Sequence, residues 1–233
     1  MSKLGALHFT KHTGAKHTAT LIFFHGSGGN GSDMKEWIKV LNKNFTFPHI
    51  KVLYPTAPRQ PYTPAGGQLS NVWFDRLDIN PFVPEHLDSL AKIEVEVRNL
   101  IQKEHEAGIP SNRIVVGGFS MGGALSLHVG YLWDRNLAGV FAHSSFLPTK
   151  SIIYNELKAD VDAQFAVPPL LQVHGNRDTL VELKWGKETF NQLKSLGVKG
   201  EFHVLDKVDH SISRKSMELI KDWVTKVLPE DSK

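Results

Sequence analysis

Residues 114–123 read IVVGGFSMGG, and this stretch decides the fold. Its start, residues 114–116, is a run of β-branched residues typical of a strand buried on both faces. Gly118-Phe119-Ser120-Met121-Gly122 then matches the pattern G-x-S-x-G, and residues 121–132 can form a helix. The chain must turn sharply from strand to helix at Ser120, which requires a strained serine and glycines where neighbouring backbone comes close. This setting, more than the short pattern, predicts that Ser120 is a nucleophile.

The same alternation of strand and helix continues along the chain in both directions. Short apolar runs predict strands at residues 20–24, 50–54, 114–116, 137–142, 169–173 and 202–205. Helical patterns lie at residues 33–43, from 87 to near Gly108, at 121–132, at 182–195 and at 217–228. Asp33 and Glu36 form a capping-box pattern that predicts the start of the first helix. This alternation predicts an α/β fold with a mainly parallel sheet, helices on both faces and no large lid domain.

The composition is that of an ordinary globular protein, with 233 residues, 41% apolar and 22% charged. No shift of composition or internal repeat marks a boundary, so we expect one domain over residues 1–233. The chain has no cysteine, which excludes a disulfide, a thiolate nucleophile, a cysteine metal site and an S-acyl anchor. A net charge of +3 is too small to suggest a nucleic-acid surface, so we expect no nucleic-acid partner.

The apolar runs are too short for membrane insertion. A spanning helix needs about 18 or more apolar residues, and no such run occurs. The first residues contain no apolar stretch of signal-peptide length, and residue 2 is serine rather than the glycine that myristoylation requires. We therefore expect a cytoplasmic protein without a stable membrane anchor.

Ser120 needs a general base, because a serine hydroxyl is a weak nucleophile. In folds with this motif the chain order is serine, acid, histidine. His128 falls in the helix after the serine, His143 comes at the end of the strand predicted at 137–142, and His203 falls in the strand at 202–205. His210 lies beyond the last strand, where loops at the carboxyl edge of a parallel sheet carry functional sites. His210 is the predicted base.

The acid that orients the histidine should lie between the two. Asp178 follows the strand at 169–173 and is the preferred candidate, because it too lies at the carboxyl edge of the sheet. Asp206 and Asp209, in the histidine loop itself, remain possible. The other candidates have no strand end before them: Asp134, Asp160 and Asp162.

A tetrahedral oxyanion needs backbone N–H donors near the serine. One should be Met121, the residue after the nucleophile. The second is predicted at Ser27, in the loop HGSGGNG of residues 25–31, where four glycines allow N–H groups to point inward. The loop lacks both G-x-G-x-x-G and a GK[ST] ending, which disfavours a phosphate-binding loop.

Residues 55–85 form an unusually long connection that holds six of the twelve prolines. Its aromatic residues argue against disorder, so we interpret it as a rigid wall of a pocket; the alternative is a loop that covers a sheet edge. The predicted substrate contacts are three aromatic residues of this segment and one that follows the fourth strand: Tyr62, Trp73, Phe74 and Phe146.

Over essentially its whole length the chain resembles the acyl-protein thioesterases and lysophospholipases of the α/β-hydrolase fold. Matching stretches are residues 24–28, 54–58, 72–75, 117–123, His174-Gly175 with Asp178, and His210. Met121 stands where the thioesterases proper carry glutamine, as in the lysophospholipase-like subgroup. The resemblance implies a Ser120–Asp178–His210 triad, an oxyanion hole at Ser27 and Met121, and hydrolysis without cofactor or metal. Gly29 departs from the family, which usually has an acid there.

Two functional hypotheses from different classes remain. The first is a serine hydrolase of acyl esters or thioesters that forms an acyl-enzyme, acts on short to medium acyl chains and is a monomer or weak homodimer. Its alternative substrates are S-palmitoylated proteins or lysophospholipids, which need a long apolar channel. The second hypothesis is a non-catalytic lipid-binding protein on a hydrolase fold, which should show a damaged triad.

Overall fold

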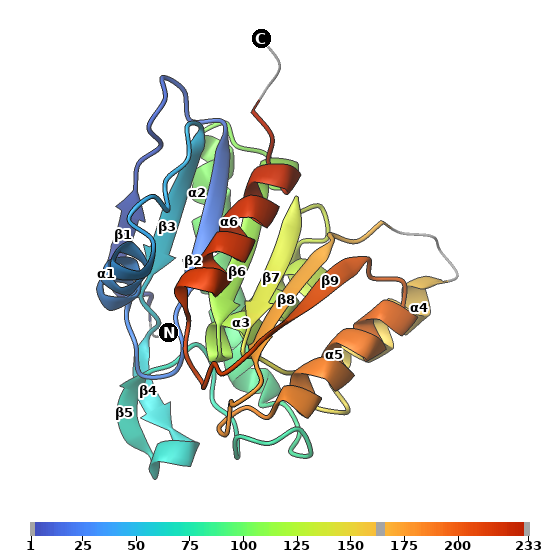
Figure 1. Ribbon diagram of the computed structural model, residues 1–233. Coiled ribbons are helices and arrows are strands. Elements are labelled where there is room, and N and C mark those ends of the chain that lie inside the picture. The colour runs from blue at the N-terminus through green and yellow to red at the C-terminus, as the bar shows by residue number, and fades with distance from the viewer. Residues whose placement is uncertain (1–2, 162–165, 231–233) are drawn as a thin grey trace.

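A computed structural model describes residues 3–161 and 166–230. The main sheet has the order β1-β3-β2-β6-β7-β8-β9, in which β1 runs antiparallel to β3 and the other neighbours are parallel (Figure 1). Its strands are β1 (Leu7–Thr10), β2 (Ala19–Phe24), β3 (Ile50–Pro55), β6 (Ile114–Phe119), β7 (Gly139–His143), β8 (Leu170–Gly175) and β9 (Gly200–Leu205). A separate antiparallel hairpin joins β4 (Arg59–Tyr62) to β5 (Gln68–Asn71).

Helices cover both faces of the main sheet (Figure 1). One face packs against α1 (Gly31–Leu41) and α6 (Arg214–Val227). The other face packs against α2 (Leu87–Glu106), α3 (Met121–His128), α4 (Ile152–Val161) and α5 (Leu183–Ser195). Short helical turns lie at Thr63–Ala65 and Ser111–Arg113, and a π-helical turn at Val129–Trp133 extends α3. The predicted α/β fold, with a mostly parallel sheet between helical layers, is confirmed.

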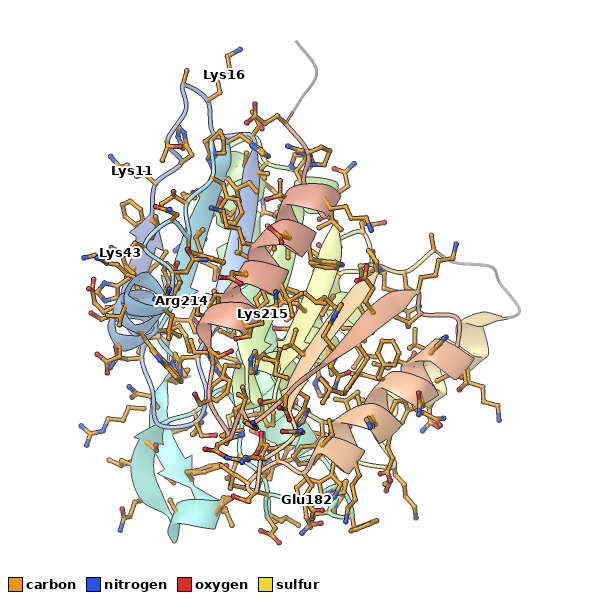
Figure 2. The ribbon with its side chains drawn as sticks, in the orientation of Figure 1. Lys11, Lys16, Lys43, Glu182, Arg214 and Lys215 are labelled. Atoms are coloured by element: carbon orange, nitrogen blue, oxygen red, sulfur yellow. The ribbon has the colours of Figure 1, made fainter. Side chains whose placement is uncertain are left out.

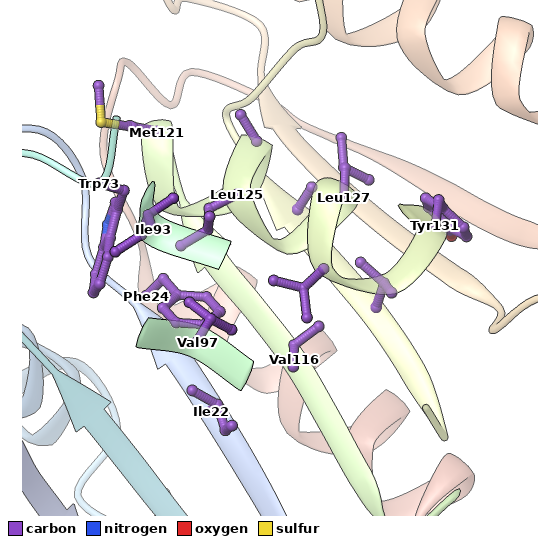
Figure 3. Packing of buried hydrophobic residues seen from close by; sticks show 14 of the residues in the cluster. Ile22, Phe24, Trp73, Ile93, Val97, Val116, Met121, Leu125, Leu127 and Tyr131 are labelled. Atoms are coloured by element: carbon purple, nitrogen blue, oxygen red, sulfur yellow. The ribbon is translucent and has the colours of Figure 1, made fainter. Parts of the chain in front are cut away.

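Strand β2 is apolar throughout because it lies between two hydrophobic cores. Ile22 and Phe24 point into the core on the α2 and α3 side, whereas Leu21 and Phe23 point into the core beneath α1 and α6. Alternate residues of a strand face opposite sides, so a strand between two helical layers needs apolar residues at every position. Figure 3 shows the first of these cores, where Phe24 meets Trp73 with ring centres 5.0 Å apart.

The start of the first helix differs from the prediction. The helix begins at Gly31 rather than Asp33, and Asn30 is its N-cap, with a side chain that accepts a hydrogen bond from the Asp33 N–H. The Asn30 amide also donates to the Asp33 carboxylate at 2.7 Å. Asparagine is as good an N-cap as aspartate. The predicted capping box at Asp33 and Glu36 was therefore wrong, because the cap lies three residues earlier, at Asn30.

Other elements had no expected counterpart. They are the edge strand β1, the hairpin β4–β5 inside residues 55–85, and helix α4. β1 is short and only half-buried, and the hairpin strands carry prolines and polar residues, so neither shows the apolar run that marks a core strand. Within the described residues, no helix is both long and apolar enough to cross a membrane.

The two ends of the sheet are distinguished in Figure 2. Lys16, which precedes β2, points outward at the top, and Glu182, which follows β8 and precedes α5, lies at the bottom. The parallel strands therefore end toward the bottom of the view. Ser120, Asp178 and His210 follow β6, β8 and β9, so the topology brings them to this same edge.

Candidate active site

The turn at Ser120 has the strained backbone that its sequence predicts. Ser120 lies between β6 and α3 with φ 55° and ψ −121°, a conformation that costs a non-glycine residue about 1–3 kcal/mol. Its N–H donates to the His143 carbonyl at 2.8 Å, and its own carbonyl accepts from the N–H groups of Gly123 and Ala124. These bonds fix the turn, so the hydroxyl is presented at the edge of the sheet.

The two glycines of the motif are required by close backbone contacts. A Cβ added at Gly118 would lie 2.4 Å from the Gly122 carbonyl carbon. A Cβ added at Gly122 would lie 2.3 Å from the Phe24 carbonyl oxygen. Any side chain at either position would push α3 away from β2 and β6. The spacing G-x-S-x-G is therefore a packing requirement as well as a motif.

The structure brings Ser120, His210 and Asp178 into one hydrogen-bonded chain. The Ser120 Oγ lies 3.0 Å from His210 Nε2, and His210 Nδ1 lies 2.7 Å from Asp178 Oδ2. The His210 side chain is 17% exposed and the Asp178 carboxylate is fully buried. A neutral histidine that donates from Nδ1 to the carboxylate can accept the serine proton at Nε2.

Hydrogen bonds keep the Asp178 carboxylate ionised despite its burial. Burial alone would raise its pKa, but the bonds from His210 and from the Val181 N–H outweigh this and hold the pKa below its usual value. Oδ1 accepts from the N–H groups of Leu180 and Val181, at 3.1 and 2.8 Å. One oxygen thus anchors the side chain and the other faces His210.

The alternative acids lie elsewhere. Asp206 accepts from the Asn176 amide at 2.9 Å, and Asp209 is exposed with no side-chain bond to His210 among the described residues. Asp134 accepts from Ser111 at 2.6 Å. Asp162 lies outside the described residues.

The two residues predicted to supply the oxyanion donors are in side-chain contact. Met121 is the first residue of α3, so its N–H has no acceptor within the helix and is free to bind an anion. The Ser27 hydroxyl contacts the Met121 sulfur at 3.7 Å, which brings the loop of residues 25–31 next to the helix start.

His25 holds the oxyanion loop through both ring nitrogens. Nε2 accepts from the Ala57 N–H at 3.0 Å, so the proton sits on Nδ1, which donates to the Gly26 carbonyl at 2.6 Å. Burial lowers the pKa of His25 to about 4, so this neutral form persists at neutral pH. The Trp73 indole N–H donates to the His25 carbonyl at 2.8 Å.

Asn71, at the end of β5, holds the glycines of the same loop. Its carbonyl accepts from the Gly28 N–H at 2.9 Å, and its side-chain amide donates to the Gly29 carbonyl at 3.1 Å. Gly28 has φ 79°, which favours glycine. These bonds restrain a segment in which four glycines alone would allow free movement. Residues 55–85 therefore support the oxyanion loop, a role that the sequence did not suggest.

The predicted substrate contacts divide into two groups. Phe74 and Phe146 line a small apolar pocket of about 30 Å³, together with Ala124, one helical turn after Ser120. Tyr62 and Trp73 do not line it; Trp73 is completely buried and its indole N–H is bonded to the His25 carbonyl. The structure thus places Trp73 beneath the oxyanion loop, as a support, and part of residues 55–85 does form a pocket wall as expected.

The sequence reasoning missed His25, Asn71 and Arg76. His25 precedes the glycine-rich loop directly, and this position was the available signal. Asn71 and Arg76 flank the quoted stretch of residues 72–75, and the resemblance implied no role for either. Among residues 3–161 and 166–230, no group of three or more histidine, cysteine or acidic side chains could hold a metal ion.

The strand order and the serine turn define an α/β-hydrolase fold. The crystal structure of Zea mays acyl-protein thioesterase 2 matches it with a TM-score of 0.82 at 27% identity, covering 96% of this chain and 99% of that one. The crystal structure of Arabidopsis thaliana SOBER1 gives a TM-score of 0.76 at 28% identity and covers 92% of this chain and 100% of that one.

Sequence comparison gives the family. Residues 7–228 match the family model described as phospholipase/carboxylesterase. The chain is 46% identical to lysophospholipase-like protein 1 of Mus musculus over 93% of this chain and 90% of that protein. It is 34% identical to acyl-protein thioesterase 1 homolog 1 of Dictyostelium discoideum over 92% of each. The chain therefore belongs to the phospholipase/carboxylesterase family of serine hydrolases.

Proposed function

We propose that this chain hydrolyses carboxylic esters or thioesters through an acyl-enzyme formed on Ser120. The observation that carries the proposal is the continuous hydrogen-bonded chain from Ser120 Oγ through His210 to Asp178, at a strained turn before a helix N-terminus. A non-catalytic member of the fold would have no reason to keep this strain or a buried carboxylate behind the histidine.

The geometry supports a two-step reaction. His210 Nε2 takes the Ser120 proton as Oγ attacks the acyl carbon, and the N–H groups of Ser27 and Met121 bind the resulting oxyanion. The intermediate collapses, and His210 gives the proton to the leaving alcohol or thiol. Water, deprotonated by His210, then releases the acid and restores the serine. Asp178 stays ionised and stabilises the imidazolium at each step.

The pocket supports short to medium acyl chains. Its apolar part, which includes Phe74, Phe146 and Leu147, gives way to the charged side chains of Arg76, Asp78 and others. A long alkyl chain would have to remove water from these polar groups without replacing their hydrogen bonds, which is unfavourable. The alternative is a long-chain S-acylated protein substrate, which the names of the thioesterase relatives suggest.

The proposed setting follows from the same features. We infer a single hydrolase domain that needs no cofactor or metal, works in the cytoplasm as a monomer or weak homodimer, and acts on a small acyl ester or an S-acylated protein. The triad residues and the backbone donors suffice for acyl transfer without a further group.

A chain-length series tests the proposal. The kcat/KM should be measured for p-nitrophenyl esters and acyl thioesters of increasing chain length, with wild type and Ser120→Ala. We expect the highest kcat/KM at short to medium chains and a loss of about 10⁴ or more in kcat for the variant. Near wild-type turnover by Ser120→Ala would refute the nucleophile, whereas a maximum at long chains would refute only the chain-length preference.

A further inference from the structure

Arg76 lines the pocket that also includes Ala124, one helical turn after Ser120, and one of its hydrogen-bond donors has no partner. Its Cζ is 5.2 Å from the ring centre of Phe74 and 5.9 Å from that of Phe146. Its Nε is buried without a hydrogen-bond partner, and the guanidinium makes no ion pair within the described residues. Ala124, which lines the same pocket, lies about 6 Å along α3 from Ser120.

This environment leaves the cation short of partners. The aromatic rings attract the guanidinium by cation–π interaction but offer its N–H groups no oxygen acceptor. Burial lowers the pKa of Arg76, because the cation has lost part of its hydration. An arginine remains protonated nonetheless, so an oxygen anion in the pocket would restore the lost hydrogen bonds.

The carboxylates of the pocket are already engaged. Glu85 accepts from Ser151 and from the Ile152 N–H, at 2.7 and 2.9 Å, and lies 2.9 Å from His128 Nε2. These bonds outweigh the effect of burial and hold the pKa of Glu85 below its usual value. Glu85 is therefore engaged by Ser151, Ile152 and His128, and it makes no ion pair with Arg76 within the described residues.

The remaining polar groups of the pocket also have partners of their own. Asp75 accepts from the Thr63 N–H and hydroxyl, at 2.9 and 2.6 Å. Asp78 closes an exposed turn by accepting from the Ile79 N–H at 2.7 Å and the Asn80 amide at 2.6 Å. His86 Nδ1 accepts from the Ser89 N–H at the start of α2. Among the described residues that line this pocket, Arg76 Nε is the buried side-chain polar atom without a hydrogen-bond partner.

We propose that Arg76 determines specificity by binding an anionic oxygen group, a carboxylate or a phosphate, that the substrate carries near its ester or thioester bond. The inference rests on the proposed function and names a substrate class for it. A planar guanidinium can present two parallel N–H groups, which match the two oxygens of such an anion. The short distance along α3 to Ser120 limits the anion to a position a few bonds from the reacting carbonyl.

Two matched substrate pairs distinguish the source of the anion. In the first pair, a monosuccinate and a butyrate ester of the same phenol differ by a carboxylate on the acyl chain. In the second, 1-butyrylglycerol 3-phosphate and 1-butyrylglycerol differ by a phosphate on the leaving group. We expect wild type to show a higher kcat/KM for the anionic member of one pair, and this preference to fall as salt is added.

Variants then locate the preference. Arg76→Gln should lower kcat/KM for the preferred anionic ester at least tenfold while changing the neutral ester less than threefold. Arg59→Gln, which removes an equal charge from an exposed position in the same segment, should change neither. Labelling of Ser120 by a fluorophosphonate confirms that each variant is folded.

Two results would overturn the inference. The first is a wild-type preference for the neutral ester in both pairs, a result that does not depend on the folding of the Arg76→Gln variant. An equal loss on both members of a pair in Arg76→Gln shows that Arg76 only supports the pocket. If neutral esters are hydrolysed normally in either case, the proposed function stands; if no ester is hydrolysed and Ser120 is not labelled, the proposed function itself fails.

Discussion

Replacement of Asp178 by asparagine should trap His210 in the wrong tautomer. Asp178 Oδ1 accepts from the N–H groups of Leu180 and Val181, while Oδ2 faces His210 Nδ1 at 2.7 Å. The amide of asparagine has one acceptor oxygen, and we expect it to accept the hydrogen bonds from the Leu180 and Val181 N–H groups. Its NH₂ group then points at His210 Nδ1 and can only donate to it.

The magnitude follows from this reversal. With Nδ1 as acceptor, the His210 proton moves to Nε2, which donates to Ser120 Oγ instead of taking its proton. The same replacement in a well-studied serine protease triad lowers kcat about 10⁴-fold, which corresponds to about 5 kcal/mol in the barrier. We expect at least a hundredfold loss here. The side-chain oxygen of residue 178 keeps its hydrogen bonds from the Leu180 and Val181 N–H groups, so the free energy of unfolding should change little.

The assay is the kcat for a neutral short-chain ester, together with the rate of Ser120 labelling by a fluorophosphonate. Asp209→Asn is the matched control, because Asp209 adjoins His210 in the chain but is exposed. It should lose less than about tenfold. Comparable losses in the two variants, or a larger loss for Asp209→Asn, would refute the assignment of Asp178.

Three further changes test the supports of the site. Gly122→Ala should lower the free energy of unfolding by about 1–3 kcal/mol in urea titrations, because its Cβ meets the Phe24 carbonyl; unchanged stability contradicts the tight turn. Trp73→Phe, which leaves the buried His25 carbonyl without its donor, should cost about 1–3 kcal/mol of stability and lower kcat about tenfold; wild-type kcat contradicts the support role. The free energy of unfolding should fall from pH 7 to pH 5, because the pKa of His25 is about 4 in the folded protein and about 6.5 in the unfolded chain, which therefore binds more protons. His25 alone should account for a loss of about 2 kcal/mol, and a urea midpoint that stays constant over this pH range contradicts the prediction.

The fold could be predicted where residue patterns reflect burial. The strands β2, β3, β6, β7 and β8 lie where apolar runs were found, because a strand between helical layers must be apolar on both faces. The edge strand β9 was also predicted, although most of its residues are at least partly exposed. The hairpin β4–β5 escaped this logic. Its strands are mostly polar, include a proline and bury only Tyr62, so they show no apolar run.

The candidate site was predictable from where its residues lie relative to the strands. Ser120, Asp178 and His210 each follow a strand end, and parallel strands bring such ends to one edge. The supports His25 and Asn71 act through backbone carbonyls and N–H groups, which no side-chain pattern records. Trp73 was expected at the substrate because it is aromatic, but its indole N–H packs inward against His25. Only three-dimensional contacts separate the two roles.

The central claim is that Ser120 is the nucleophile, and intact-mass analysis of the protein after treatment with a fluorophosphonate tests it most directly. We predict a single adduct that maps to the peptide containing Ser120, forms in competition with a short-chain ester, and is absent in Ser120→Ala. A folded wild-type protein that gains no adduct, or an adduct that persists in Ser120→Ala, would contradict the account.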